Sequence, residues 1–427
     1  MRINNDQIRE YNQRGQAEHS RMLGFLAETL EKRGIDVNET INRLHELQVA
    51  IPSWALGSGG TRFGRFPVGG EPGTLEAKLE DVGLLHKITQ ATSSVSLHIP
   101  WDIPEDASAR KKQAEELGIR FEAVNSNTFQ DQPGQPYTYK FGSLSANDSM
   151  SRNLAVEHNL EVIKYGEMLG SKSITVWLAD GSSYPGQNNF RRAFRNTEDS
   201  LHKIYEGLPT DWKMLIEYKP YEPHFYSTVI QDWGTSLMLA ESCGKQAYTL
   251  VDLGHHLPNT NIEQIVSTLI MRGRLGGFHF NDSKYGDDDL TCGSIKPFQL
   301  FLICNEIIDG MNQNTAGNPP IEWMIDASHN LKDPLVDLMQ SLEAIRLAYA
   351  QALIVDREAL NEAQSANDVS RAQEIIQDAY RTDMRPLLAE VRKQHGGALN
   401  PLGFYRDQSV REQLIAERGK NVVASGL

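Results

Sequence analysis

The chain has 427 residues, 40% of them hydrophobic, which is enough for one large α/β domain with an appended segment. Its formal net charge of −14 disfavours nucleic acid as a partner, because an acidic surface repels phosphate groups, and it suits a small neutral substrate. No run reaches ~18 apolar residues and residues 1–18 are polar, so we expect a cytoplasmic protein with no signal peptide and no membrane partner.

Residues 1–48 are predicted to form a helical segment that precedes the main domain. Apolar residues such as Ile8, Leu26, Leu30 and Ile41 recur there among many charges. This spacing is typical of amphipathic helices, and it indicates a pair of helices that caps the domain.

Within residues 49–345, short apolar runs alternate with longer amphipathic stretches. The runs are Val49–Trp54, Ser94–His98, Arg120–Asn125, Ser173–Leu178, Met214–Tyr218, Tyr248–Asp252, Gly277–Asn281 and Glu322–Asp326. The clearest helical patterns are Leu75–Thr89, Ala107–Leu117, Ser151–Leu169, Phe190–Tyr205, Ile230–Ser242 and Ile262–Arg272. This alternation predicts parallel βαβ units, and about eight units favour a closed (β/α)8 TIM barrel. The alternative is an open doubly wound sheet, whose dinucleotide-binding form is disfavoured because no G-x-G-x-x-G motif follows the first run.

Residues 346–427 are predicted to form a C-terminal helical extension. Charged helical patterns rich in Ala, Leu, Glu and Arg cover Ala344–Asn361, Val369–Tyr380 and Met384–Lys393. Because the barrel is complete before them, we expect these helices to pack on the barrel or on another subunit.

A polar or aromatic residue lies at or near the C-terminal end of each apolar run. These residues are Trp54, His98, Asn125, Trp177, Glu217, Asp252, His279 and Asp326. In a barrel of this kind, the carboxyl ends of the strands open on one mouth, where catalytic groups lie. Packing alone does not explain a functional side chain at the end of every run, so the pattern predicts a site at the mouth.

Seven candidate metal ligands lie at or just after four consecutive strand ends. They are Glu217, Asp252, His255, His279, Asp287, Asp289 and Asp326. Carboxylates with one or two imidazoles and no thiolate suit Mn²⁺, Mg²⁺ or Co²⁺, and seven ligands fit two ions better than one. Asp252 could bridge both ions, while Asp288 should point away from its two neighbours. Each residue alone could be structural, as an N-cap or a solvated turn, but convergence on one mouth favours the metal site.

Aromatic side chains near four strand ends are candidates for a substrate-binding wall. They are Trp54, Trp101, Phe129 and Trp177. Sugars present apolar C–H faces to aromatic rings, and such a wall excludes water; packing at the barrel top is the alternative for each ring. Lys219 follows Glu217 by two residues and could polarise a substrate oxygen or move a proton, with a structural salt bridge as the equal alternative.

The segment Gly57–Phe66 is rich in glycine but lacks the G-x-x-x-x-G-K-[ST] pattern of a phosphate-binding loop. We interpret it as a mobile loop that carries Phe63 over the mouth. An ordinary surface loop is the alternative.

Five segments of the chain resemble the L-rhamnose isomerase family, in the branch that also accepts D-allose and related sugars. They are SLHIPWD at residues 96–102, NSNTF at 125–129, VDLGHH at 251–256, GFHFNDSKYGDDD at 277–289 and MIDASH at 324–329. The resemblance extends over nearly the whole chain. It implies a barrel with a C-terminal helical arm, a homotetramer, and two divalent ions per subunit, Mn²⁺ foremost.

The resemblance also implies a role for each candidate residue. The first ion would be held by Glu217, Asp252, His279 and Asp326, and the second by Asp252, His255, Asp287 and Asp289. Glu217 and Asp326 would also serve catalysis, and His255 would also contact the substrate. His98 would assist ring opening, and Lys219 would lie near the reacting carbons. Phe63 would enter a neighbouring subunit's site.

Tyr218 departs from the family pattern, which has histidine between the glutamate and the lysine. On a strand this side chain points away from Glu217 and Lys219, so we expect little effect on the metals. Fine substrate preference is the property that the change could alter.

The expected reaction is the reversible isomerisation of L-rhamnose to L-rhamnulose. A metal-assisted hydride shift between C1 and C2 is preferred, and an enediol route would need a base such as Lys219 or Glu217. The alternatives are a sugar epimerase or a metal hydrolase on the same barrel, including a nuclease, and a non-catalytic sugar-binding protein. The acidic surface disfavours the nuclease, and the number of metal ligands disfavours a simple binder.

Overall fold

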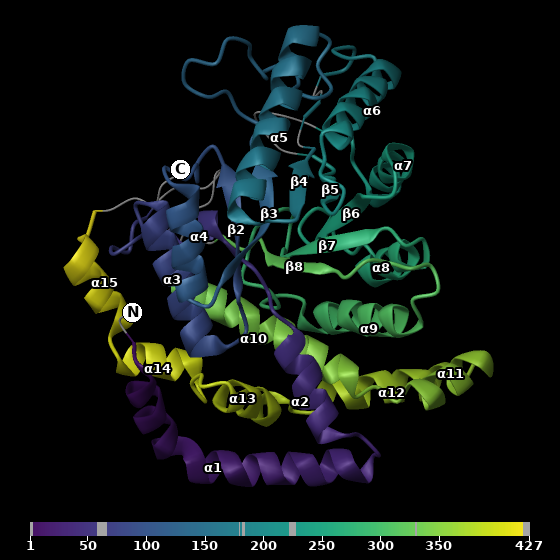
Figure 1. Ribbon diagram of the computed structural model, residues 1–427. Helices are drawn as coiled ribbons and strands as arrows, with labels where there is room; N and C mark the ends of the chain where they lie inside the picture. Colours follow the sequence, from purple (N-terminus) through teal and green to yellow (C-terminus); the bar gives the residue numbers. More distant parts are fainter. Residues whose placement is uncertain are drawn as a thin grey trace.

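The computed structural model describes residues 3–57, 66–178, 180–181, 184–221, 228–328 and 331–421. Eight parallel strands lie in chain order: β1 (Ile51–Pro52), β2 (Ser94–Ile99), β3 (Arg120–Ser126), β4 (Ser173–Trp177), β5 (Lys213–Glu217), β6 (Ala247–Asp252), β7 (Leu275–Phe280) and β8 (Glu322–Ile325). Ala50 pairs with Met324 and joins the first strand to the last. The predicted TIM barrel is therefore confirmed (Figure 1).

Helices follow the strands and surround the barrel. They are α3 (Leu75–Thr89), α4 (Ala107–Glu116), α5 (Ser149–Leu169), α6 (Phe190–Glu206), α7 (Trp233–Cys243), α8 (Ile262–Met271), α9 (Pro297–Gln313) and α10 (Pro334–Leu353), with a short 3-10 turn, η1 (Ser53–Ala55), after β1. Side chains cap most of these helices, as Thr74 does at α3 and Asp232 at α7. Helix α9 instead begins with Pro297, which suits the first turn because it lacks an amide proton there.

The two ends of the chain contribute the remaining helices: α1 (Asn5–Lys32), α2 (Val37–Glu46), α11 (Arg357–Ser365), α12 (Val369–Arg381), α13 (Arg385–Gln394), α14 (Pro401–Asp407) and α15 (Val410–Arg418). Helix α13 packs on both α1 and α2, so the two ends meet in one helical layer beside the barrel (Figure 1). No helix among the described residues is both long and apolar enough to cross a membrane.

The predicted single helix Ala344–Asn361 is wrong in detail. Helix α10 ends at Leu353 and α11 begins at Arg357, because the Asp356 side chain accepts from the Ala359 amide at 3.0 Å and starts a new helix. The expected domain boundary after residue 345 falls inside α10.

The strand register lines up the ends of neighbouring strands. His98 lies opposite Asn125, Trp177 opposite Glu217, and Asp252 opposite His279. Below this level the barrel interior is filled by a small apolar cluster of Ala50, Ala123, Leu215, Leu250 and Met324. The packed floor and the aligned ends leave the polar groups at one mouth.

Candidate active site

Four side chains from the ends of β5, β6, β7 and β8 form the first group of ligand atoms. They are Glu217, Asp252, His279 and Asp326, and one donor atom from each lies within 4.8 Å of the others. His279 Nδ1 is 3.0 Å from Glu217 Oε1 and 3.8 Å from both Asp252 Oδ2 and Asp326 Oδ2. The predicted set of four is brought together in full.

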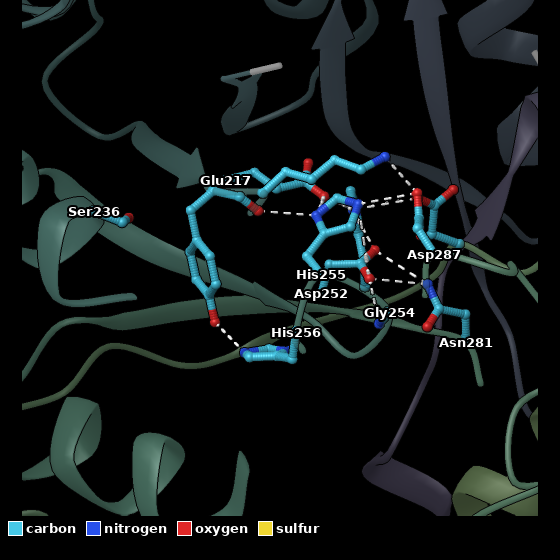
Figure 2. Close-up of polar contacts among 12 residues, drawn as sticks. Glu217, Ser236, Asp252, Gly254, His255, His256, Asn281 and Asp287 are labelled. Carbon is cyan, nitrogen blue, oxygen red and sulfur yellow. Dashed lines mark hydrogen bonds and ion pairs between the residues drawn. The ribbon is translucent and has the colours of Figure 1, made fainter. Parts of the chain in front are cut away.

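Asp252, His255 and Asp287 form a second group that satisfies the same distance criterion. His255 Nε2 lies 3.6 Å from Asp287 Oδ2 and 4.0 Å from Asp252 Oδ1 (Figure 2). Asp252 therefore belongs to both groups, as the bridging role requires. Asp289 lines the same cavity, but among the described residues it joins neither group.

A tight turn after β6 brings His255 back over Asp252. The Gly254 amide donates to Asp252 Oδ1 at 2.7 Å, and the His255 amide donates to the Asp252 carbonyl at 3.2 Å. A Cβ on Gly254 would lie 2.8 Å from Asp287 Oδ1, which is closer than real side chains approach. Glycine at this position is what allows the two ligand loops to meet.

The loop that carries Asp287 is held at both ends. Asp282 and Leu290 exchange backbone hydrogen bonds of 2.9 Å, and Asp288 accepts from the amides of Lys284 and Tyr285 at 2.6 and 2.9 Å. Asp288 thus braces the loop from outside while Asp287 faces the ligands, which agrees with the alternation expected from sequence.

The His255 ring is oriented as a metal-binding imidazole requires. Its Nδ1 lies 2.9 Å from the Tyr218 carbonyl, an atom that can only accept, so the ring proton resides on Nδ1. In the neutral ring, Nε2 then carries the lone pair and faces Asp252 and Asp287. A carbonyl that fixes the tautomer in this way is a common second partner of a ligating histidine.

Charges in the cluster shift pKa values in a pattern that calls for a cation. Burial lowers the pKa of His279, but Glu217, Asp326 and Asp252 outweigh it and raise the value to about 9. Burial likewise lowers the pKa of His255, and Asp252 with Asp287 raises it to about 8. Burial raises the pKa of Asp326 to about 7, and His279 only partly opposes this.

These shifts mean that the metal-free cluster holds protons because its carboxylates are short of positive charge. Its donors are buried oxygens and imidazole nitrogens, which is the chemistry that Mn²⁺, Co²⁺ and Mg²⁺ select. The residues present therefore fit divalent cations.

The other side of the mouth is aromatic and nearly uncharged. Phe129 lies edge-on to Trp177 with ring centroids 4.7 Å apart, and His98 lies edge-on to Trp54 at 5.5 Å. Trp54 Nε1 donates to Asp326 Oδ1 at 2.8 Å, which links this wall to the first ligand group. Burial lowers the pKa of His98 to about 3, so its ring is neutral.

These walls line one small pocket at the mouth of the barrel, together with the ligand groups. Its described lining includes Trp54, Phe129 and Trp177, but not Trp101. Trp101 stacks on His98 with centroids 4.2 Å apart and so supports that ring from behind. Phe63, expected above the mouth, lies outside the described residues.

Lys219 and Tyr218 lie on opposite faces of the chain after β5. Lys219 Nζ is 2.5 Å from Asp287 Oδ2 and 5.0 Å from the centre of the Trp177 ring. The Tyr218 hydroxyl bonds to His256 Nε2 at 2.6 Å. The His256 ring lies apart from Asp252 and Asp287 (Figure 2). The salt bridge that was one of the two alternatives for Lys219 is present, and it places the ammonium at the second group.

Two polar side chains near the ligands were missed in the sequence. Asn281 Nδ2 donates to both Asp252 oxygens at 3.0 and 3.2 Å, and Ser328 lines the cavity beside Asp326. Both follow a predicted ligand by two residues, which is the signal that could have found them.

Two curated relatives resemble the chain over most of its length. A probable sugar isomerase of Rhizobium meliloti (strain 1021) is 51% identical over 393 residues, which cover 92% of this chain and 91% of the relative. A probable sugar isomerase of Mesorhizobium japonicum is also 51% identical, over 401 residues that cover 94% of this chain and 93% of the relative. No family model matches the chain.

Solved structures with the same architecture are much more distant in sequence. An L-ribulose 3-epimerase has a TM-score of 0.54 at 14% identity and covers 76% of this chain and 98% of its own. A 3-keto-D-glucoside 4-epimerase from E. coli has a TM-score of 0.51 at 13% identity and covers 70% and 99%. At such identities these structures share the barrel fold alone.

Proposed function

The chain belongs to the family of these probable sugar isomerases, and from that premise we propose that it is a divalent-metal-dependent aldose–ketose isomerase. Its proposed reaction interconverts L-rhamnose and L-rhamnulose, with related aldoses as further substrates. The observation that supports this most is the position of Asp252, whose carboxylate belongs to both ligand groups. Bound there, two divalent cations, Mn²⁺ foremost with Co²⁺ or Mg²⁺ as alternatives, would polarise the sugar's carbonyl and adjacent hydroxyl oxygens as Lewis acids.

His98 is assigned to ring opening. Its side chain is buried and neutral and lines the cavity across from the carboxylates. A neutral imidazole carries one N–H that can donate to the ring oxygen of a pyranose, and the other nitrogen can accept a hydroxyl proton. The rings of Trp54 and Trp101 on either side keep its orientation fixed.

Lys219 is assigned to the reacting carbons. Its ammonium lies between Asp287 and the face of Trp177, with the lysine side chain 1% exposed. A fixed positive charge there would stabilise negative charge on a sugar oxygen, which favours hydrogen transfer between C1 and C2. The ion pair with Asp287 suits a fixed charge better than a base, and this favours a hydride shift over an enediol route.

The proposal also includes a quaternary structure, which rests on the family resemblance alone. A cytoplasmic homotetramer would let Phe63 of one subunit reach the site of another. Asp289, which lies on the cavity wall, would join the second ligand group with the ion bound.

The first experiment treats purified protein with EDTA and then restores Mn²⁺, Co²⁺ or Mg²⁺ separately. A panel of L-rhamnose, L-lyxose, D-mannose and D-allose is assayed for ketose product. Loss of activity in EDTA, recovery with metal and the highest kcat/KM on L-rhamnose support the proposal. A product epimerised at one carbon with its carbonyl unmoved would identify an epimerase and overturn it.

A second experiment follows hydrogen in L-rhamnose deuterated at C2. A hydride shift carries the deuterium to C1 of the product. Extensive exchange with solvent would reject the hydride shift and leave the enediol route.

A further inference from the structure

A buried ion pair lies behind His98. Lys78 of α3 and Asp102, which follows β2, are both fully inaccessible to solvent, and Lys78 Nζ donates to Asp102 Oδ1 at 2.7 Å. The other oxygen, Asp102 Oδ2, accepts from the His98 amide at 2.9 Å and from Ser53 Oγ at 2.5 Å. One carboxylate therefore joins an outer helix to the ends of two strands.

The two chain segments that Asp102 joins carry two walls of the cavity. Ser53 directly precedes Trp54, and the His98 amide belongs to the residue whose ring lines the mouth. Trp54 in turn donates to Asp326 and contacts the His98 ring. A shift of Asp102 would move both side chains relative to the ligand groups.

Stability alone is a poor explanation for this pair. Removing two charges from water is so unfavourable that a buried ion pair is seldom more stabilising than apolar side chains of the same size. A buried charged pair does impose one geometry, because each charged group must keep its hydrogen-bond partners at fixed positions. The geometry fixed here is that of His98 and Trp54.

We propose that Lys78 and Asp102 are positioning residues, which hold His98 and Trp54 in the arrangement needed to open the sugar ring. Neither side chain is placed to touch the substrate. The inference rests on the proposed function for the identity of the step, and on the hydrogen bonds alone for the placement of the rings.

The test compares two variants of the same helix. Lys78→Met removes the ammonium at similar length. Asp81→Asn is the matched control, because Asp81 is also buried on α3 but pairs with Arg418 of α15 at 2.7 Å, away from His98. Both variants are assayed as metal-reconstituted full-length protein, with unfolding temperature measured in parallel.

We expect Lys78→Met to lower kcat on L-rhamnose by about a hundredfold, the effect of misplacing a reacting group by about an ångström. Affinity for L-rhamnitol, an open-chain analogue that needs no ring opening, should fall much less than kcat, because only its contact with Trp54 is disturbed. Asp81→Asn should lower the unfolding temperature without this split. In a His98→Asn background, Lys78→Met should cause little further loss, since residues acting as one unit are not additive.

Equal losses of kcat and L-rhamnitol affinity, or fully additive losses with His98→Asn, would overturn the inference. If Lys78→Met does not fold, Ser53→Ala replaces it, and an unchanged kcat there would count equally against the network. A crystal structure of the variant separates the two claims. If the wild type isomerises no aldose, the proposed function fails. If the His98 and Trp54 rings of the variant occupy their wild-type positions, the positioning role is rejected.

Discussion

The two halves of the barrel mouth use histidine in opposite ways. On the half built from β1 to β4, His98 is buried among aromatic rings, and burial lowers its pKa to about 3. On the half built from β5 to β8, His255 and His279 are buried as deeply, yet carboxylates raise their pKa values to about 8 and 9. The same residue type is thus a neutral hydrogen-bonding group on one side and a ligand among unbalanced carboxylates on the other.

This contrast teaches that neighbours, and not depth of burial, decide the chemistry of each half. In the proposed function the acidic half would hold the cations, and the aromatic half would contact the apolar faces of the sugar and exclude water. Substitution of Asp252 in the acidic half and substitution of His98 in the aromatic half should therefore have different effects on metal content and on kcat.

The largest effect is expected from Asp252→Asn, since Asp252 serves both ligand groups. Loss of the bridging carboxylate should remove several kcal/mol of transition-state stabilisation, about a thousandfold or more in kcat/KM. Elemental analysis after dialysis should show less than the wild-type metal content. Asp211→Asn, at an exposed pair with Lys172, is the control and should change neither quantity.

His98→Asn should impair the function of the aromatic half without affecting metal binding by the acidic half. We expect kcat on L-rhamnose to fall by about a hundredfold, which is the usual contribution of a positioned acid–base group. Because His98 belongs to neither ligand group, metal content should stay at the wild-type level. A parallel loss of metal would show that the two halves are not separable.

The acidic half should also give the metal-free protein a distinctive pH dependence. The pKa values of His255 and His279 are raised above the ordinary 6.5, so the folded state binds their protons more tightly than the unfolded state does. The stability gained is complete below about pH 6.5 and is lost as pH rises through about 8 and 9. Asp326, raised to about 7, acts in the same direction from about pH 4 to 7.

The measurement is the unfolding temperature of EDTA-treated protein between pH 6 and 9. It should fall as pH rises, whereas saturating Mn²⁺ should reduce the fall, because the metal replaces the protons. Calorimetry should detect proton release on Mn²⁺ binding, and the release should shrink above about pH 9. A metal-free protein that gains stability over this range would contradict the assigned charges.

The first ligand group could be predicted because the ends of strands can be recognised in the sequence. Glu217, Asp252 and His279 lie at or next to the ends of strands that pair in register, so alternation and topology alone bring these residues together. The first ligand group follows from that logic in full. The grouping of Asp252, His255 and Asp287 also needs Gly254, whose missing side chain permits the close approach.

What the sequence could not show depends on contacts between distant segments. Lys78 reads as one more lysine on an amphipathic helix, and only the packing of α3 on the barrel buries it against Asp102. Trp101 stacks on His98 and does not line the described pocket. The direction of its side chain could not be predicted from the spacing of residues in the sequence. Likewise, the break at Asp356 depends on a cap that competes with a continuous helical pattern.

The smallest expected effect concerns Tyr218, which directly follows β5 and lies between Glu217 and Lys219 in the chain. Burial raises its pKa well above 10, and burial lowers that of His256 to about 3, so a neutral hydroxyl shares a hydrogen bond with a neutral ring. Tyr218→Phe leaves that nitrogen without its partner and should destabilise the fold by about 1–3 kcal/mol. Since His255 is held by the Tyr218 carbonyl, which the variant keeps, metal content and kcat should stay near wild type. Thermal unfolding and a kinetic assay together decide the matter: a change in kcat or substrate preference without a loss of stability would mean that this side chain reaches the acidic half through His256.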